Sequence, residues 1–270
     1  MRSDADVTGP IGTGLLAKAG KWCRESVLDP ALCVLFPPRC VGCGDFETHL
    51  CSRCRSTLIP TGPDRCPRCG EPGPRPVLTG RCNHCMGRML SFAGAQSAFQ
   101  HQGVTRRLVA EFKFGGQPVL GRVMARLAAP TFCQYVDSLG PPGSVLVTWV
   151  PAHRSAERER GYNQAAVLAQ ALAGEAGGLP TSAAAHKVAP TRHQQRLDRA
   201  GRQANLRGAF KLSGSFHHSP ETRCLLLVDD VYTTGATASE VSSVLAAGTG
   251  LPVYIFTFSR ARGGSGEGHD

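Results

Sequence analysis

With 270 residues, 41% of them hydrophobic, the chain has room for one catalytic domain of roughly 150–200 residues and a smaller module. Its 30 Lys and Arg against 20 Asp and Glu give a formal net charge of +10, which points to phosphate-bearing ligands, large or small. The absence of a long apolar run and of an N-terminal secretory signal excludes a membrane span and predicts a cytoplasmic protein.

The first part of the chain, residues 1–35, is expected to be a helical segment. An intermittent apolar stripe runs through residues 14–36 and includes Leu15, Leu16 and Trp22. Pro37 and Pro38 then end any helix, because proline cannot continue one.

Residues 36–88 are rich in Cys, Pro, Gly and Arg and have too few apolar residues for an ordinary core. Eight of the twelve cysteines form four C-x-x-C pairs in this segment: Cys40 with Cys43, Cys51 with Cys54, Cys66 with Cys69, and Cys82 with Cys85. Two such pairs complete a closed tetrahedral site of four thiolates. Gly44 and Gly70 suit the tight turns after two of the pairs. The spacing predicts a double zinc ribbon with two structural zinc ions.

Alternatives to sequential zinc ribbons remain open at this point. The first pair could combine with the third and the second with the fourth, or the pairs could be redox dithiols. His49 and His84 are surplus to two complete sets, and the isolated cysteines (Cys23, Cys33, Cys133, Cys224) are expected to be small core residues. Eight thiolates and two zinc ions would reduce the formal charge to about +6.

Residues 89–262 alternate strands with helices, which predicts an α/β domain with a mostly parallel sheet covered on both faces. A Gly-rich tail at 263–270 is expected to be disordered. In chain order, we expect a strand at 91–100, helices at 104–114 and 118–139, a strand at 144–151, a helix at 163–173, a strand at 224–230, a helix at 235–248 and a strand at 252–260.

The segment LLLVDDVYTTGAT at residues 225–237 has the clearest functional pattern. Asp229 and Asp230 end a buried strand, where ligands bind in open α/β sheets, and two adjacent carboxylates can accept hydrogen bonds from ribose hydroxyls. The loop that follows, made of Thr233, Thr234, Gly235, Ala236 and Thr237, presents backbone N–H groups and hydroxyls at a helix start, where anions bind. Together these elements fit a ribose 5-phosphate, whereas the alternative is an ordinary turn with an aspartate cap.

A second basic segment follows the strand at 144–151. His153, Arg154, Arg158 and Arg160 lie where the chain leaves the sheet at the same edge, and arginines so placed stabilise a departing pyrophosphate. The alternative is a solvated helix start in which Glu157 and Glu159 are the salt-bridge partners. The polar stretch at 191–210 fits equally well a hood over the pocket or a solvated helix.

These motifs resemble known families. LLLVDDVYTTGAT resembles the signature of type I phosphoribosyltransferases, which implies that the two aspartates hold the ribose, that residues 233–237 hold the 5′-phosphate and that Mg²⁺ bridges the pyrophosphate. With the double zinc ribbon, the whole resembles the ComF family over residues ~30–260. That family is associated with natural competence and DNA uptake and is similar to amidophosphoribosyltransferases.

The resemblance to the ComF family extends to further residues. Lys113, in FKFGG, matches a lysine near the start of the family's domain, and His153 stands where the family often has a histidine. Tyr162 replaces the usual Phe of an RGFNQ element. The other matching positions are Arg160, Gly161, Asn163 and Gln164 in that element and Gln194, Leu197, Arg202 and Asn205 in the next. The resemblance implies a phosphoribosyl pyrophosphate site formed by the loop with His153, Arg154, Arg160 and Lys113.

Three functions compete on the sequence. The first is a phosphoribosyltransferase, a pentosyl-transferring enzyme that uses phosphoribosyl pyrophosphate with Mg²⁺, supports DNA uptake and has an unknown acceptor. The second is a non-catalytic adapter that binds single-stranded DNA through the ribbons and the basic region at 151–211, which holds ten Lys and Arg against four acids. The third is a redox switch. The ComF resemblance implies single-stranded DNA and a competence helicase-like protein as partners.

Overall fold

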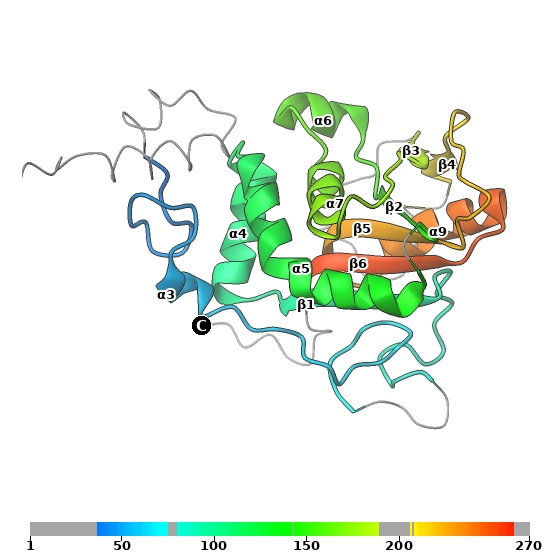
Figure 1. Cartoon of the computed structure of the whole chain (residues 1–270), viewed down its shortest axis with the longest axis horizontal. Coiled ribbons are helices and arrows are strands. Elements are labelled where there is room, and N and C mark those ends of the chain that lie inside the picture. The colour runs from blue at the N-terminus through cyan, green and yellow to red at the C-terminus, as the bar shows by residue number, and fades with distance from the viewer. Residues whose placement is uncertain (1–36, 75–79, 142, 189–205, 207, 262–270) are drawn as a thin grey trace, which may run out of the picture.

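The computed structural model describes residues 37–74, 80–141, 143–188, 206 and 208–261 (Figure 1). The expected N-terminal helical segment and the C-terminal tail lie outside these residues, as do Gln194, Leu197, Arg202 and Asn205. In the described part of the chain, no helix has the length and apolar character needed to cross a bilayer.

Four parallel strands form the central sheet in the order β1-β6-β5-β2. The strands are β1 (Gly94–Gln100), β2 (Val145–Trp149), β5 (Cys224–Tyr232) and β6 (Val253–Arg260). All four were predicted within a few residues, because each carries a run of residues that favour buried strands. Their carboxyl ends meet at one edge of the sheet, where ligands bind in this class of fold.

Three helices cover one face of the sheet (Figure 1): α4 (Gly103–Phe114), α5 (Val119–Leu139) and α7 (Gln164–Glu175). Side chains alternate along β5, so that Leu226 and Val228 pack on this side with Leu108 of α4 and Leu168 of α7. The predicted parallel sheet flanked by helices is therefore confirmed.

The opposite face is covered by α9 (Ala236–Thr249), by a small antiparallel pair and by part of the zinc-ribbon module. Leu225 and Leu227 of β5 pack here with Val241 and Leu245 of α9. The antiparallel pair joins β3 (Ala185–Lys187) to β4 (Phe210–Leu212). Neither strand was predicted, since three residues are too few to show a periodic pattern.

The segment between the two ribbons runs along the outer edge of β1. The amide of Gln100 donates to the carbonyl of Ile59 at 2.8 Å, and the amide of Thr61 donates to the carbonyl of Ala98 at 3.0 Å. These bonds satisfy backbone groups that an edge strand would otherwise expose. The ribbon module is thus attached to the sheet through main-chain pairing.

Candidate functional site

The eight paired cysteines form two clusters in sequential order. One contains Cys40, Cys43, Cys51 and Cys54, and the other contains Cys66, Cys69, Cys82 and Cys85. A tetrahedral zinc ion with bonds of about 2.3 Å to sulfur separates its sulfur atoms by about 3.8 Å. The Sγ–Sγ distances are 3.6 Å for Cys43–Cys51, 3.7 Å for Cys66–Cys85 and 3.6 Å for Cys69–Cys82. The spacing fits a metal site and is far too long for a disulfide.

Both clusters use the same backbone turn to hold their first cysteine. The amide of Gly44 donates to the carbonyl of Cys40, and that of Gly70 donates to the carbonyl of Cys66, both at 2.8 Å. Gly44 and Gly70 adopt left-handed φ values of 81° and 74°, as predicted for these turns. Burial disfavours ionisation, yet backbone amides lower the pKa of Cys40 to about 6 and that of Cys66 to about 7. The backbone therefore favours the thiolate of the first cysteine in each cluster, whereas burial raises the pKa of Cys54, Cys69 and Cys85.

The assignment to two structural zinc sites agrees with this geometry, and four thiolates leave no open position for chemistry. The cysteine clusters contain neither His49 nor His84. Of the isolated cysteines in the described residues, Cys224 is a buried core residue as predicted. Cys133 is only half-buried, and its Sγ lies 3.9 Å from the carbonyl of Glu175 at the end of α7.

The predicted acidic pair lies near the C-terminal end of strand β5, at the carboxyl edge of the sheet. Asp230 is 5% exposed, and the Nζ of Lys113 lies 2.8 Å from its Oδ1. Lys113 comes from the last turn of α4, so the structure brings together two residues that are far apart in the sequence. The backbone amide of Asp230 donates to the Oδ1 of Asp229 at 2.9 Å.

Burial and mutual repulsion set the protonation of this cluster. Burial raises the pKa of Asp229 to about 7, the charge of Asp230 adds to the rise, and Lys113 opposes it. Burial alone would lower the pKa of Lys113, but the two carboxylates outweigh it and raise that pKa. Asp229 is thus a carboxylate whose ionised form would be stabilised by an approaching cation or by hydroxyl donors.

Residues 233–237, here the threonine loop, connect β5 to α9. Gly235 is the residue before the helix and has a left-handed φ of 75°. The hydroxyl of Thr234 accepts from the amide of Ala236 at 3.3 Å, whereas Thr233 is exposed and Thr237 half-buried. Gly235 has no side chain to cap the helix, so apart from the bonded amide of Ala236 the first helical turn offers backbone N–H groups next to the acidic pair, an arrangement that binds anions.

The basic segment after β2 forms a short helix, α6 (Arg154–Arg160), in agreement with the helix start that the sequence left open as an alternative. His153 caps this helix, because its Nδ1 accepts from the amide of Ser155 at 3.3 Å. No residue of α6 is buried. The strand before it is adjacent to β5, with Trp149 opposite Val228, so the chain leaves the sheet directly beside Asp229.

The segment RGYNQ ties α6 and α7 to the end of α4. Arg160 donates to the Oε1 of Gln164 at 3.2 Å. Its guanidinium carbon lies 5.3 Å from the ring centre of Phe114, the residue that follows Lys113. Asn163 caps α7 and donates to the carbonyl of Val150 at 3.2 Å. Tyr162 donates its hydroxyl proton to the carbonyl of Phe112. The motif therefore positions the loop after β2 against the helix that carries Lys113.

A cavity of about 500 Å³ opens beside the loop after β2. Its lining includes the predicted residues His153 and Arg154, together with Trp149 and with His186 and Lys187 of β3. The lining does not include the acidic pair or the threonine loop. The predicted residues thus fall in two adjacent parts of one sheet edge: His153, Arg154 and Arg160 follow β2, whereas the acidic pair, the threonine loop and Lys113 lie at the end of β5.

One residue near the acidic pair was missed by the sequence analysis. His101 directly follows β1 and lies close enough to Lys113 and Asp230 to be affected by their charges, although burial is the main reason its pKa is lowered. Its Nδ1 lies 2.9 Å from the Oγ of Ser259. Its position just after a strand at the ligand-binding edge was the signal available in the sequence.

Comparison with known proteins agrees with this architecture. Residues 31–86 match the double zinc ribbon domain family. The chain is 29% identical over 214 residues to competence protein F of Haemophilus influenzae, which covers 77% of this chain and 90% of that protein. It is 28% identical over 198 residues to DNA utilization protein YhgH of Salmonella typhi, and the match covers 72% of this chain and 83% of that protein. It is 24% identical over 219 residues to competence protein ComFC of Bacillus subtilis, and the match covers 80% of this chain and 85% of that protein.

A double zinc ribbon docked on a parallel α/β domain defines the class of protein. Relatives named competence protein F, ComFC and YhgH share most of their length with this chain. These relatives and the double zinc ribbon support the resemblance of the chain to the ComF family.

Proposed function

We propose that the carboxyl edge of the sheet binds phosphoribosyl pyrophosphate with Mg²⁺ and that the protein is a phosphoribosyltransferase supporting DNA uptake. The observation that carries the proposal is the Lys113–Asp230 pair, 2.8 Å apart, held beside Asp229 and next to the threonine loop. A cation paired with two adjacent carboxylates beside an amide-rich helix start suits a ligand that carries both hydroxyls and phosphates.

Each part of the ligand has a matching group in this arrangement. Asp229 and Asp230 would accept hydrogen bonds from the ribose hydroxyls, and the backbone amides from Gly235 to Thr237 would donate to the 5′-phosphate. The half-buried Asp229 has a raised pKa because of desolvation and the charge of Asp230, which fits a site that also takes up a divalent cation. Mg²⁺ supplies charge neutralisation for the pyrophosphate, with water and substrate oxygens as most of its ligands.

The pyrophosphate would lie toward the loop after β2. His153, Arg154 and Arg160 carry donors on this side, and positioned arginines stabilise the charge that builds up on a leaving pyrophosphate. In the transfer, the bond from C1′ to the pyrophosphate oxygen breaks and the pyrophosphate leaves with the electron pair. The acceptor then forms its bond to C1′ and loses a proton. The cavity lined by Trp149, His186 and Lys187 adjoins this loop and gives the acceptor a place.

The biological setting is inferred from the relatives. Proteins named for competence and for DNA utilization cover between 72% and 80% of this chain. We therefore assign the chain to the handling of incoming DNA, with single-stranded DNA and a competence helicase-like protein as partners. The acceptor of the phosphoribosyl group would belong to that process.

Isothermal titration with phosphoribosyl pyrophosphate and Mg²⁺ tests the proposal. The wild-type protein should bind, and the double variant Asp229→Asn with Asp230→Asn should lose binding at least about a hundredfold, because two charged acceptors are removed. Arg53→Ala is the control, since Arg53 lies in an exposed ion pair with Asp45 in the first ribbon. Absence of heat and of a thermal shift at millimolar ligand would rule the proposal out.

A second candidate is a non-catalytic adapter for single-stranded DNA. The observation in its favour is the exposed ring of Phe114, 73% exposed, with the guanidinium of Arg160 5.3 Å from its centre. Exposed aromatic rings beside cations bind single strands by stacking and charge. This candidate predicts oligonucleotide binding that weakens with salt and is reduced by Phe114→Ala, while Asp229→Asn has no effect.

A further inference from the structure

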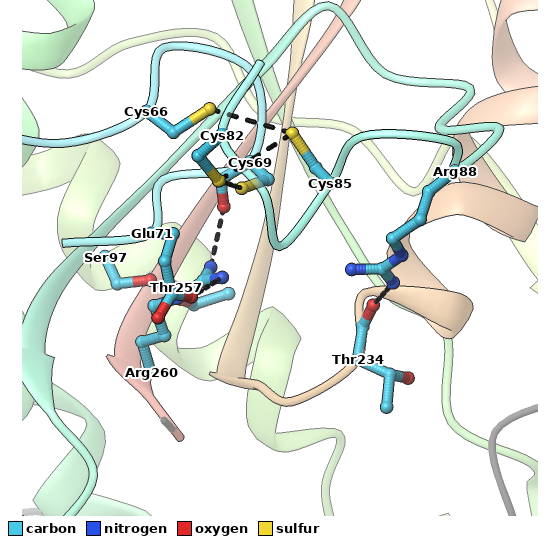
Figure 2. Close-up of polar contacts among 10 residues, drawn as sticks. All are labelled: Cys66, Cys69, Glu71, Cys82, Cys85, Arg88, Ser97, Thr234, Thr257 and Arg260. Atoms are coloured by element: carbon cyan, nitrogen blue, oxygen red, sulfur yellow. Dashed lines mark hydrogen bonds and ion pairs between the residues drawn. The ribbon is translucent and has the colours of Figure 1, made fainter. Parts of the chain in front are cut away.

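The second ribbon (residues 65–74 and 80–91) packs directly against the threonine loop. The guanidinium of Arg88 donates from Nη2 to the backbone carbonyl of Thr234 (Figure 2). Three residues further on, the amide of Ser91 donates at 3.0 Å to the hydroxyl of Ser239, in the first turn of α9. The segment that leaves the second zinc site is therefore bonded to the loop and to the helix whose start lies at the proposed phosphate position.

The bond from Arg88 fixes a peptide plane in the loop. In a trans peptide, the carbonyl of one residue and the N–H of the next point in opposite directions. Because the carbonyl of Thr234 faces Arg88, the N–H of Gly235 faces away from the ribbon. Figure 2 shows the side chain of Thr234 also directed away from Arg88. Arg88 thus orients the groups that would meet an anion without touching the anion itself.

A second connection runs through Arg260 at the end of β6. Arg260 is 2% exposed, and its Nη1 donates at 2.6 Å to the carbonyl of Cys69, a ligand of the second zinc site (Figure 2). Its Nε donates at 2.8 Å to Glu71. The guanidinium also lies 4.2 Å from the centre of the Tyr232 ring. The zinc-site backbone and the residue that precedes the threonine loop are therefore held by one buried arginine.

Tyr232 carries this connection into the loop. It is 2% exposed, and its ring meets that of Phe92 edge to face at 6.3 Å. Its hydroxyl lies so close to the α-carbon of Gly235 that a side chain at this position would clash with it. The loop therefore packs on Tyr232. Tyr232 in turn packs on Arg260, which is bonded to the second ribbon.

The first ribbon makes a different contact. The carbonyl of Gly42 accepts from Arg107 of α4 at 2.8 Å, and Val41 packs on the core under the same helix. The two zinc sites thus support different elements, although their local turns are alike.

We propose that the second zinc site, acting through Arg88 and Arg260, is a positioning device for the threonine loop, so that its loss weakens phosphate binding whereas loss of the first zinc does not. The effect on ligand affinity rests on the proposed function, but the effect on loop order does not. Arg88 and Arg260 are positioning residues, since neither is placed against the ligand.

Hydrogen exchange of the segment 234–237, in which the amide of Ala236 is bonded to the Thr234 hydroxyl, tests the positioning directly. Arg88→Ala should speed their exchange about tenfold, the equivalent of one lost bond to a charged group, and Arg88→Lys should restore part of the protection. Arg53→Ala is the matched control, a ribbon arginine in an exposed ion pair, and should leave these amides unchanged. Unchanged exchange in Arg88→Ala would overturn the proposal.

A second experiment tests the role of the metal. It compares hydrogen exchange in Cys82→Ser and in Cys43→Ser, each of which removes one ligand from one zinc site. Only Cys82→Ser should speed exchange at 234–237, and equal effects of the two variants would overturn the proposal. Where Cys82→Ser fails to fold, Arg88→Ala carries the test, because it leaves both cysteine clusters intact.

Affinity separates this inference from the proposed function. Arg88→Ala should weaken binding of phosphoribosyl pyrophosphate about tenfold while leaving binding of pyrophosphate alone unchanged, because pyrophosphate does not need the threonine loop. General destabilisation would weaken both ligands equally and would contradict positioning. Faster loop exchange in Arg88→Ala, with no ligand binding by the wild-type protein, would support the inference and refute the proposed function.

Discussion

Asp229 and Asp230 are adjacent in sequence but differ in their partners. Asp230 has the ammonium of Lys113 at 2.8 Å, whereas the Oδ1 of Asp229 accepts from the backbone amide of Asp230 at 2.9 Å. Burial therefore raises the pKa of Asp229 to about 7, far above the ordinary value of an aspartate. This difference makes Asp229 the residue whose charge changes near neutral pH.

The affinity for phosphoribosyl pyrophosphate should depend on pH through Asp229. A carboxylate accepts from ribose hydroxyls best when ionised, and its raised pKa means that ionisation is lost as pH falls through about 7. Titration calorimetry should show affinity rising about tenfold from about pH 6 to about pH 8. Asp229→Asn should bind more weakly with a flatter profile, which corrects for titration of the ligand's own phosphates. Parallel profiles in the two proteins would contradict this role.

Lys113 should matter for stability as well as for binding. Lys113→Met would leave the 7%-exposed carboxylate of Asp230 without its counter-charge, at a cost of roughly 2–3 kcal/mol in the free energy of unfolding. The cost is set below that of a fully buried pair, because Lys113 itself is 29% exposed. Urea denaturation measures it. Adding Asp230→Asn should restore part of the loss, and additive effects of the two changes would show that the pair is not coupled.

At the scale of elements, the two zinc turns look equivalent in sequence but not in their surroundings. Gly44 and Gly70 both have left-handed backbones. A Cβ at Gly44 would meet nothing within 4 Å, whereas one at Gly70 would lie 2.6 Å from the carbonyl oxygen of Ala95 in β1. The turn at Gly70 therefore packs closely against β1, whereas the turn at Gly44 has free space beside it.

This difference gives a matched pair of substitutions. Gly44→Ala and Gly70→Ala should each lose about 1 kcal/mol to the left-handed backbone, and Gly70→Ala should lose roughly 1–3 kcal/mol more through the clash with β1. Thermal unfolding in excess zinc should therefore place Gly70→Ala well below Gly44→Ala. Equal melting temperatures would show that the second ribbon does not pack on β1 as described.

The main elements could be predicted because their signals are local. Runs such as LLLV before Asp229 define buried strands, and paired cysteines with a following glycine define zinc turns. The basic character of residues 151–160 is visible in the sequence, which also allowed a helix start there, but the cap by His153 is visible only in the folded chain. Strands β3 and β4 were too short to leave any pattern.

At the scale of the whole molecule, the contacts that matter for the site connect distant parts of the chain. Arg88 and Thr234 are 146 residues apart, and Arg260 and Cys69 are 191 apart. An arginine near a zinc ribbon or at the end of a strand carries no local sign of such a partner. The sequence therefore predicts which residues form the two zinc sites and the acidic pair, but not that the second ribbon is part of the core beneath the threonine loop.

The sheet edge proposed to bind the ligand is supported from two sides. Helices α4 and α7 hold Lys113 and the loop after β2, while the second ribbon and α9 hold the threonine loop. In this view the zinc module is part of the architecture of the ligand site and not an appended domain.

A crystal structure with phosphoribosyl pyrophosphate and Mg²⁺ tests the central claim most directly. The account predicts the 5′-phosphate on the amides from Gly235 to Thr237, the ribose hydroxyls on Asp229 and Asp230, and the pyrophosphate toward Arg154. A ligand bound away from these residues, with its phosphates outside the threonine loop, would contradict it.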